Sequence, residues 1–192
     1  MSPQTFRTIS NGGRKSTSAA GARGRVGTVL RHEMTVVGSS VADVVASTGG
    51  WLYDHRMAGW QVSVLVADRS GERSLRILGA DVLDLSADLE AVTDDPECAS
   101  TLAVAADLFA ADRRVRQCVS ASECSRAEVA LWGDPARLGE NVNAVSYRLS
   151  AAARAFKAQA LTAAGFSGSP VEATEALYRR GVTVLPRVAA RF

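Results

Sequence analysis

The chain has 192 residues, of which 47% are hydrophobic and 22% are charged, and its formal net charge is +2. This length is typical of one domain, and the apolar share is that of a folded globular protein, which argues against wholesale disorder. No stretch approaches the roughly 18 uninterrupted apolar residues of a membrane-spanning helix, so we expect no membrane association.

The charge is unevenly distributed along the chain. Residues 1–32 contain six basic and no acidic residues, residues 33–146 contain nine basic and eighteen acidic residues, and residues 147–192 contain seven basic and two acidic residues. The acidic middle argues against a wholly basic nucleic-acid-binding domain, but it leaves open a basic arm that contacts an acidic partner or nucleic acid. The candidate contacts in this arm are Arg7, Arg14, Lys15, Arg23, Arg25 and Arg31.

Residues 1–33 are rich in Ser, Gly and Arg and show no apolar periodicity. This composition predicts a disordered basic tail, followed by a single α/β domain over residues 34–192. A transit peptide has a similar composition, and an extension that precedes a start at Met34 is a further alternative.

The first predicted helix covers residues 40–57. Ser40 and Asp43 have the spacing of a capping box, and apolar residues then recur at helical intervals. Residues 61–67 and 74–79 alternate apolar and polar side chains, which is typical of strands. Because the six residues between them cannot contain a crossover helix, we expect these strands to form an antiparallel hairpin.

The second half of the chain alternates predicted helices and strands. Asp95-Pro96 and Asp134-Pro135 both resemble helix starts, with a capping residue followed by proline. The predicted helices are 96–119, 135–164 and 170–180, and the predicted strands are 127–132 and 182–185. Together with the first helix and the hairpin, these elements predict one layered α/β domain, with a mixed sheet of about four strands packed by helices.

Apolar residues in the predicted helix 135–164 recur at intervals of four and three, the spacing of a heptad seam. These positions favour either a long helix packed on its own sheet or a helix that pairs with its copy in a homodimer. The candidate self-association residues are Leu138, Val142, Val145, Leu149 and Phe156.

The three cysteines, Cys98, Cys118 and Cys124, match no zinc-binding spacing, and only two histidines are present. We therefore predict no metal site, and the sequence indicates no cofactor. An odd number of cysteines argues against a disulfide framework and favours a reducing cytoplasm. His55 follows Leu52 on the apolar face of the first helix and is interpreted as a partly buried structural histidine.

The ends of the predicted strands suggest where a ligand would bind. In α/β sheets, ligands bind beyond the carboxyl ends of strands, where helix N-termini present free N–H groups. Asp68 follows one strand, and Trp132, Gly133 and Asp134 end another. These four residues are the candidate ligand-binding site, although Asp134 as a helix cap and Asp68 as a turn residue are simpler explanations.

Two functions follow from these features. The favoured hypothesis is a non-enzymatic interaction protein that self-associates and contacts an acidic partner through its basic arm, because no catalytic motif is present. The alternative is a small-molecule-binding α/β domain or an enzyme, with its pocket near Asp68 and Gly133-Asp134.

Overall fold

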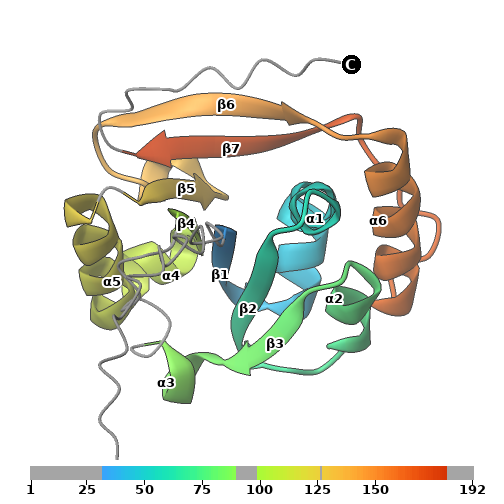
Figure 1. Ribbon diagram of the computed structural model, residues 1–192, viewed down its shortest axis with the longest axis horizontal. Helices are drawn as coiled ribbons and strands as arrows, with labels where there is room; N and C mark the ends of the chain where they lie inside the picture. Colours follow the sequence, from blue (N-terminus) through green and yellow to red (C-terminus); the bar gives the residue numbers. More distant parts are fainter. Residues whose placement is uncertain (1–31, 90–98, 126, 181–192) are drawn as a thin grey trace, which may run out of the picture.

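The computed structural model describes residues 32–89, 99–125 and 127–180, and these residues form a seven-stranded sheet in the order β3-β2-β1-β4-β5-β7-β6 (Figure 1). Five strands are mutually parallel: β1 (His32–Ser40), β2 (Gln61–Asp68), β3 (Asp81–Asp84), β4 (Ala99–Ala105) and β5 (Glu128–Trp132). Two strands form an antiparallel extension: β6 (Val142–Arg148) and β7 (Thr174–Arg180), of which β7 pairs with β5.

Helices cover both faces of the sheet, and each face has its own hydrophobic core (Figure 1). The helices of one face are α1 (Val41–Met57), α2 (Arg73–Ile77) and α6 (Ala151–Ala163). Those of the other are α3 (Leu85–Asp88), α4 (Ala106–Ala111) and α5 (Arg113–Cys124). Consecutive residues are buried in β2 (64–66), β4 (102–105) and β5 (129–132), as expected for parallel strands that are buried on both faces.

The chain leaves β1 and β4 toward opposite faces of the sheet, although these strands are neighbours. After β1 the chain enters α1 and continues to β2, while after β4 it enters α4 and continues toward β5. This arrangement creates a topological switch point between β1 and β4, which is where open α/β sheets bind ligands.

The predicted α/β fold, with a mixed sheet packed by helices, is confirmed, but the described sheet has seven strands rather than about four. The predicted helix 40–57 and strand 127–132 match α1 and β5. The predicted strand 182–185 and residues 1–31 lie outside the described residues, so the strand and the disordered tail stay predictions. No helix in the described part of the chain is long and apolar enough to span a membrane.

The predicted hairpin of 61–67 and 74–79 is wrong. Residues 73–77 form the short helix α2, and the strand that pairs with β2 is β3, which runs parallel to it. Leu75 and Leu78 are both buried, and their spacing of three places them on one helical side. One short helix is therefore enough to connect these two parallel strands.

The other three predicted helices are wrong in whole or in part. Within 96–119, residues 99–105 form β4, and α4 and α5 follow as two separate helices. Within 135–164, a 3₁₀ helix η2 (Pro135–Arg137) and strand β6 precede α6. In place of 170–180 lies β7, in which Glu175 and Leu177 are buried while Ala176 is exposed, the two-residue period of a strand.

Candidate functional site

The side chains that follow β1, β4 and β5 meet at the carboxyl edge of the parallel strands. Asp43 lies in the first turn of α1, directly after β1, and Ser40 caps this helix by accepting the Asp43 N–H at 3.2 Å. The Asp43 carboxylate does not return to the cap. Its Oδ2 accepts the indole N–H of Trp132 at 3.0 Å, and its Oδ1 accepts the Ser47 hydroxyl at 3.1 Å.

A second contact crosses the switch point itself. The Ser39 hydroxyl, near the end of β1, donates to Oδ2 of Asp107, in the first turn after β4. Oδ1 of the same carboxylate accepts the Leu108 N–H at 2.8 Å. The two carboxylates after β1 and β4, Asp43 and Asp107, are thus held in defined orientations by hydrogen bonds.

Both carboxylates line a small cavity of about 220 Å³. Trp132, Gly133, Asp134 and Arg137 also line this cavity. Asp134 caps η2 by accepting the Ala136 N–H at 3.0 Å. The charged residues that line this cavity are therefore three carboxylates and one guanidinium, which favours neutral or cationic groups over anions.

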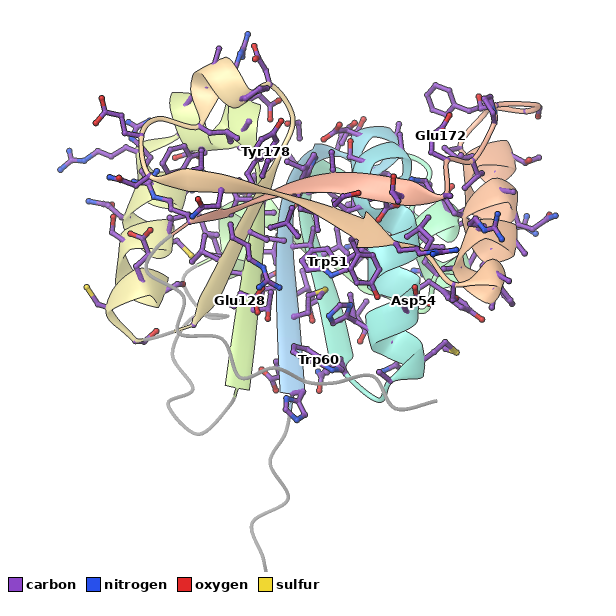
Figure 2. The ribbon with its side chains drawn as sticks, turned by 90° about the horizontal axis from the view of Figure 1, so that it is seen from above. Trp51, Asp54, Trp60, Glu128, Glu172 and Tyr178 are labelled. Carbon is purple, nitrogen blue, oxygen red and sulfur yellow. The ribbon has the colours of Figure 1, made fainter. Side chains whose placement is uncertain are left out.

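A larger cavity of about 400 Å³ shares Trp132 and Gly133 with the small one. Ala46 and Ser47 of α1 line one side of it, Lys157 and Leu161 of α6 another, and Tyr178 of β7 a third. Figure 2 shows Glu172 and Tyr178, which both line this cavity, toward the edge where the parallel strands end.

Trp132 and Gly133 line both cavities, and we refer to the two together as the carboxyl-edge cleft. Gly133 has a backbone φ of +108°, a conformation that side chains disfavour, and a Cβ there would lie 3.2 Å from the Ala106 Cβ. The sequence Trp132-Gly133 therefore combines a buried ring that lines both cavities with a backbone turn that only glycine adopts easily.

An ion pair lies in the wall of the larger cavity. Lys157 Nζ is 2.6 Å from Glu175 Oε1, and the two side chains are only 7% and 3% exposed. Burial raises the pKa of Glu175, while the Lys157 ammonium and the N–H groups of Gly50 and Trp51 oppose this rise. The remaining partner of Lys157 is the backbone oxygen of Ala46, at 2.6 Å.

Aromatic and imidazole rings gather toward the opposite, amino edge of the parallel strands. His32 stacks on Trp60, and His55 lies edge-on to both Trp51 and Trp60, with ring centroids 4.9–5.1 Å apart. Tyr147 donates to Asp54 at 3.5 Å, and burial followed by the Asp54 charge raises the pKa of this phenol to about 12. Figure 2 shows Trp60 at the end of the sheet away from Tyr178.

Within the described residues, no group of three or more His, Cys, Asp or Glu side chains is arranged to bind a metal ion. His32 begins β1 and His55 lies in the last turn of α1, both away from the carboxyl-edge cleft. The ionisable side chains that line this cleft are carboxylates, one amine, one guanidinium and one phenol.

The structure brings three of the four predicted ligand-binding residues together. Trp132, Gly133 and Asp134 all line the small cavity, whereas Asp68 lines neither cavity. Asp68 is an exposed residue at the end of β2, where its Oδ1 accepts the Ser70 N–H at 2.8 Å. Hydrogen bonds from Ser70 lower the pKa of Asp68, as in an ordinary turn.

The predicted self-association residues do not share a helical face. Leu138 is fully buried and Leu149 nearly so, while Val142 and Val145 lie in β6. Phe156 is 43% exposed and stacks on Tyr53 at 4.5 Å. A homodimer stays a prediction, but it can no longer be argued from a helical seam of these residues. The basic residues of the predicted arm, Arg7 to Arg31, lie outside the described residues.

Sequence analysis missed most of the cleft. Asp43 was identified only as part of a capping box, and Ser39, Asp107, Lys157 and Glu175 were not singled out. The one available signal was position, because Asp43 and Asp107 each lie in the first helical turn after a parallel strand. That signal requires β1 and β4 to be recognised as neighbouring strands.

No protein-family profile matches the chain, and no curated protein matches it significantly. Solved structures do share its fold. A deacetylase triple mutant from the teicoplanin biosynthetic pathway matches with a TM-score of 0.55 and 12% identity, over 77% of this chain and 97% of that chain. The 4-carboxy-2-hydroxymuconate hydratase of Pseudomonas putida KT2440 matches with a TM-score of 0.52 and 13% identity, over 84% of this chain and 99% of that one. At these identities the likeness shows the fold alone.

The predicted non-enzymatic interaction protein is contradicted by these comparisons, since the two solved structures named above that share the fold are a deacetylase and a hydratase. The helix on which predicted self-association depended is also absent, since a strand and a turn occupy the first half of 135–164. The comparisons favour the alternative hypothesis of a small-molecule-binding domain or enzyme.

Proposed function

We propose that this chain binds a small molecule in the carboxyl-edge cleft, with Trp132 between the two parts of the ligand site. The observation that carries this proposal is the position of the cleft. The small cavity opens beside the switch point between β1 and β4, and the larger cavity adjoins it through Trp132 and Gly133, which line both. Open α/β sheets bind their ligands at this position.

The charges of the cleft favour a neutral or cationic ligand. Asp43, Asp107, Asp134 and Glu172 line it, while Lys157 and Glu175 neutralise each other. Arg137 is the remaining cation of the lining. An anion would approach this excess of carboxylates against an unfavourable potential.

Enzymatic turnover of the bound molecule is the second candidate, and the enzymes that share the fold favour it. Asp43 and Asp107 are the groups best placed for proton transfer in the small cavity. Hydrogen bonds from Trp132 and Ser39 orient them, and a general acid or base must be oriented in this way to reach its proton.

A thermal-shift screen tests the binding proposal. The panel contains neutral, cationic and anionic small molecules, and we expect stabilisation by members of the first two groups. A ligand at one hundred times its Kd adds about 2.7 kcal/mol to the free energy of unfolding. A panel in which anions alone stabilise the protein would contradict the proposed charge preference, and a panel without any response would contradict ligand binding.

A matched pair of substitutions locates the bound molecule. Ala46→Phe places a large ring in the larger cavity, and Ala152→Phe places the same ring on the exposed surface of α6. We expect Ala46→Phe to weaken binding of a stabilising compound at least tenfold, and Ala152→Phe to leave it unchanged. Equal binding by both variants would place the ligand outside the larger cavity.

A further inference from the structure

The buried pair of Lys157 and Glu175 contacts the interior of α1. Glu175 Oε1 accepts the Gly50 N–H at 2.9 Å, and Oε2 accepts the Trp51 N–H at 2.8 Å. Lys157 donates to the backbone oxygen of Ala46 at 2.6 Å. Gly50 and Ala46 are four residues apart, so a regular helix would join this same N–H and this same oxygen to each other.

The ion pair therefore contacts both the N–H group and the carbonyl oxygen that would form one backbone hydrogen bond of α1. A side chain that enters the ladder of a helix bends or opens it at that turn. The two charged residues come from α6 and β7, which form the opposite side of the larger cavity. The pair thus connects three elements of the cleft at one turn of α1.

Stability alone does not explain such a pair. Removing two charges from water costs several kcal/mol per ion, and apolar residues of similar volume are often neutral or stabilising in the same place. Geometry offers a better explanation. Ala46 is followed directly by Ser47, whose hydroxyl donates to Asp43, and Asp43 accepts the indole N–H of Trp132.

We propose that Lys157 and Glu175 are positioning residues of the carboxyl-edge cleft. They hold the middle of α1 against α6 and β7, and this contact sets where Ser47 donates to Asp43 and where Asp43 accepts the indole N–H of Trp132. The inference rests on the proposed function, since it assigns the pair a role in shaping that ligand site.

Nuclear magnetic resonance on the full chain tests the inference without any ligand. In Glu175→Gln, the amides of Gly50 and Trp51 lose a charged acceptor, and we expect their hydrogen exchange to accelerate at least tenfold. We also expect the indole N–H resonance of Trp132 to shift, because its partner Asp43 moves with α1. Glu140→Gln is the matched control, since this exposed carboxylate lines neither cavity and should change neither signal.

A second variant guards against loss of folding. Lys157→Met combined with Glu175→Leu replaces both charges by apolar side chains, and we expect it to fold with a melting temperature near that of the natural chain while the Trp132 resonance still shifts. An unchanged Trp132 resonance in Glu175→Gln or in the double variant would overturn the inference, because the pair would then only stabilise α1.

The two proposals fail in different experiments. Absence of any response in the compound screen contradicts ligand binding, but it does not affect the resonance experiment on Trp132, which uses no ligand. An unchanged resonance, together with a compound that binds and is displaced by Ala46→Phe, contradicts positioning by the pair and leaves ligand binding intact.

Discussion

His55 shows at the scale of one residue how burial controls ionisation in this protein. Its Nδ1 lies 2.9 Å from the Trp51 backbone oxygen, to which it donates, and the rings of Trp51 and Trp60 enclose it edge-on. Burial lowers the pKa of His55, although the Trp51 oxygen, Glu128 and Asp54 oppose the shift. The folded protein therefore favours the neutral imidazole.

This shift predicts an acid-sensitive stability. Below the unfolded-state pKa of about 6.5 the unfolded chain binds a proton that the folded chain resists, so the free energy of unfolding falls as the pH decreases through this value. The slope for one proton is at most about 1.4 kcal/mol per pH unit. Urea unfolding between pH 8 and pH 5 should show a steeper loss for the natural chain than for His55→Gln.

The region above pH 8 is the control for this prediction. The imidazole is neutral there in both the folded and the unfolded chain, so the stability difference between the natural chain and His55→Gln should be constant. Parallel stability curves at acidic pH would show that His55 contributes nothing to acid sensitivity.

Single residues of the cleft differ in how far the sequence reveals them. Gly133 was predictable because it ends a short apolar strand, and its neighbours Trp132 and Asp134 were identified with it. Lys157 and Glu175 were not, because a buried charge contradicts the hydrophobic pattern and its partner lies 18 residues away. Position along the chain predicts local caps and turns, whereas pairs of residues that are distant in sequence can be identified only once the fold is known.

At the scale of elements, two adjacent glycines of α1 have different surroundings. A Cβ at Gly50 would lie 2.5 Å from Leu149 Cδ1, whereas a Cβ at Gly49 would lie 3.1 Å from Leu78 Cδ1. From the sequence alone, both glycines are only weak helix formers. The structure shows that Gly50 lets the segment after β6 pack closely on α1.

We therefore predict opposite outcomes for one substitution at these neighbours. Gly50→Ala overpacks the contact with Leu149 and should lower the free energy of unfolding by about 1–3 kcal/mol. Gly49→Ala gains about 1 kcal/mol of helix propensity. Its Cβ makes a close contact only with the flexible end of the Leu78 side chain, so the free energy of unfolding should stay within about 1 kcal/mol of that of the natural chain. Urea unfolding of both variants measures the difference.

The partner of Gly50 supplies the control. In a chain that carries Leu149→Ala the space beside Gly50 is empty, so adding Gly50→Ala should cost less there than in the natural chain. An equal cost in both backgrounds would show that Leu149 is not the side chain that excludes alanine.

The predicted helix 135–164 was wrong in its first half because the apolar spacing continues across a turn. Apolar intervals of four and three continue from Leu138 to Phe156, but Gly139 and Asn141 adopt positive φ angles of 74° and 63°, which end η2 before β6 begins. Residues three apart in a strand face opposite sides, so Val142 and Val145 cannot belong to one seam. The periodic pattern therefore crosses η2, β6 and α6, and only α6 is the helix that it predicts.

At the scale of the whole molecule, the order of strands is what the sequence reveals least. β1 and β4 lack the strict alternation of half-exposed strands, and their pairing joins residues 32–37 to residues 99–104. Periodicity predicts which residues are buried, but it does not predict which distant segment lies beside them. The α/β class was therefore predictable, and the switch point that defines the cleft was not.

The two hydrophobic cores of the sheet test whether residues 34–192 behave as the single domain predicted from the sequence. Leu65 of β2 is fully buried in the core beside α5, and Leu75 of α2 is fully buried in the core beside α1 and α6. Replacing either residue by Ala should cost about 2–5 kcal/mol. Because both cores pack on the same strands, loss of either one should destabilise the whole sheet.

Both variants should therefore unfold in one transition at a lower urea concentration, with tryptophan fluorescence and far-ultraviolet circular dichroism following the same curve. Trp51 and Trp132 belong to the core beside α1, so fluorescence reports mainly on that side, while circular dichroism reports on helices of both faces. If Leu65→Ala melted the α5 side first, the dichroism would change before the fluorescence. Such a separation would show two independently unfolding layers and would contradict a single cooperative domain.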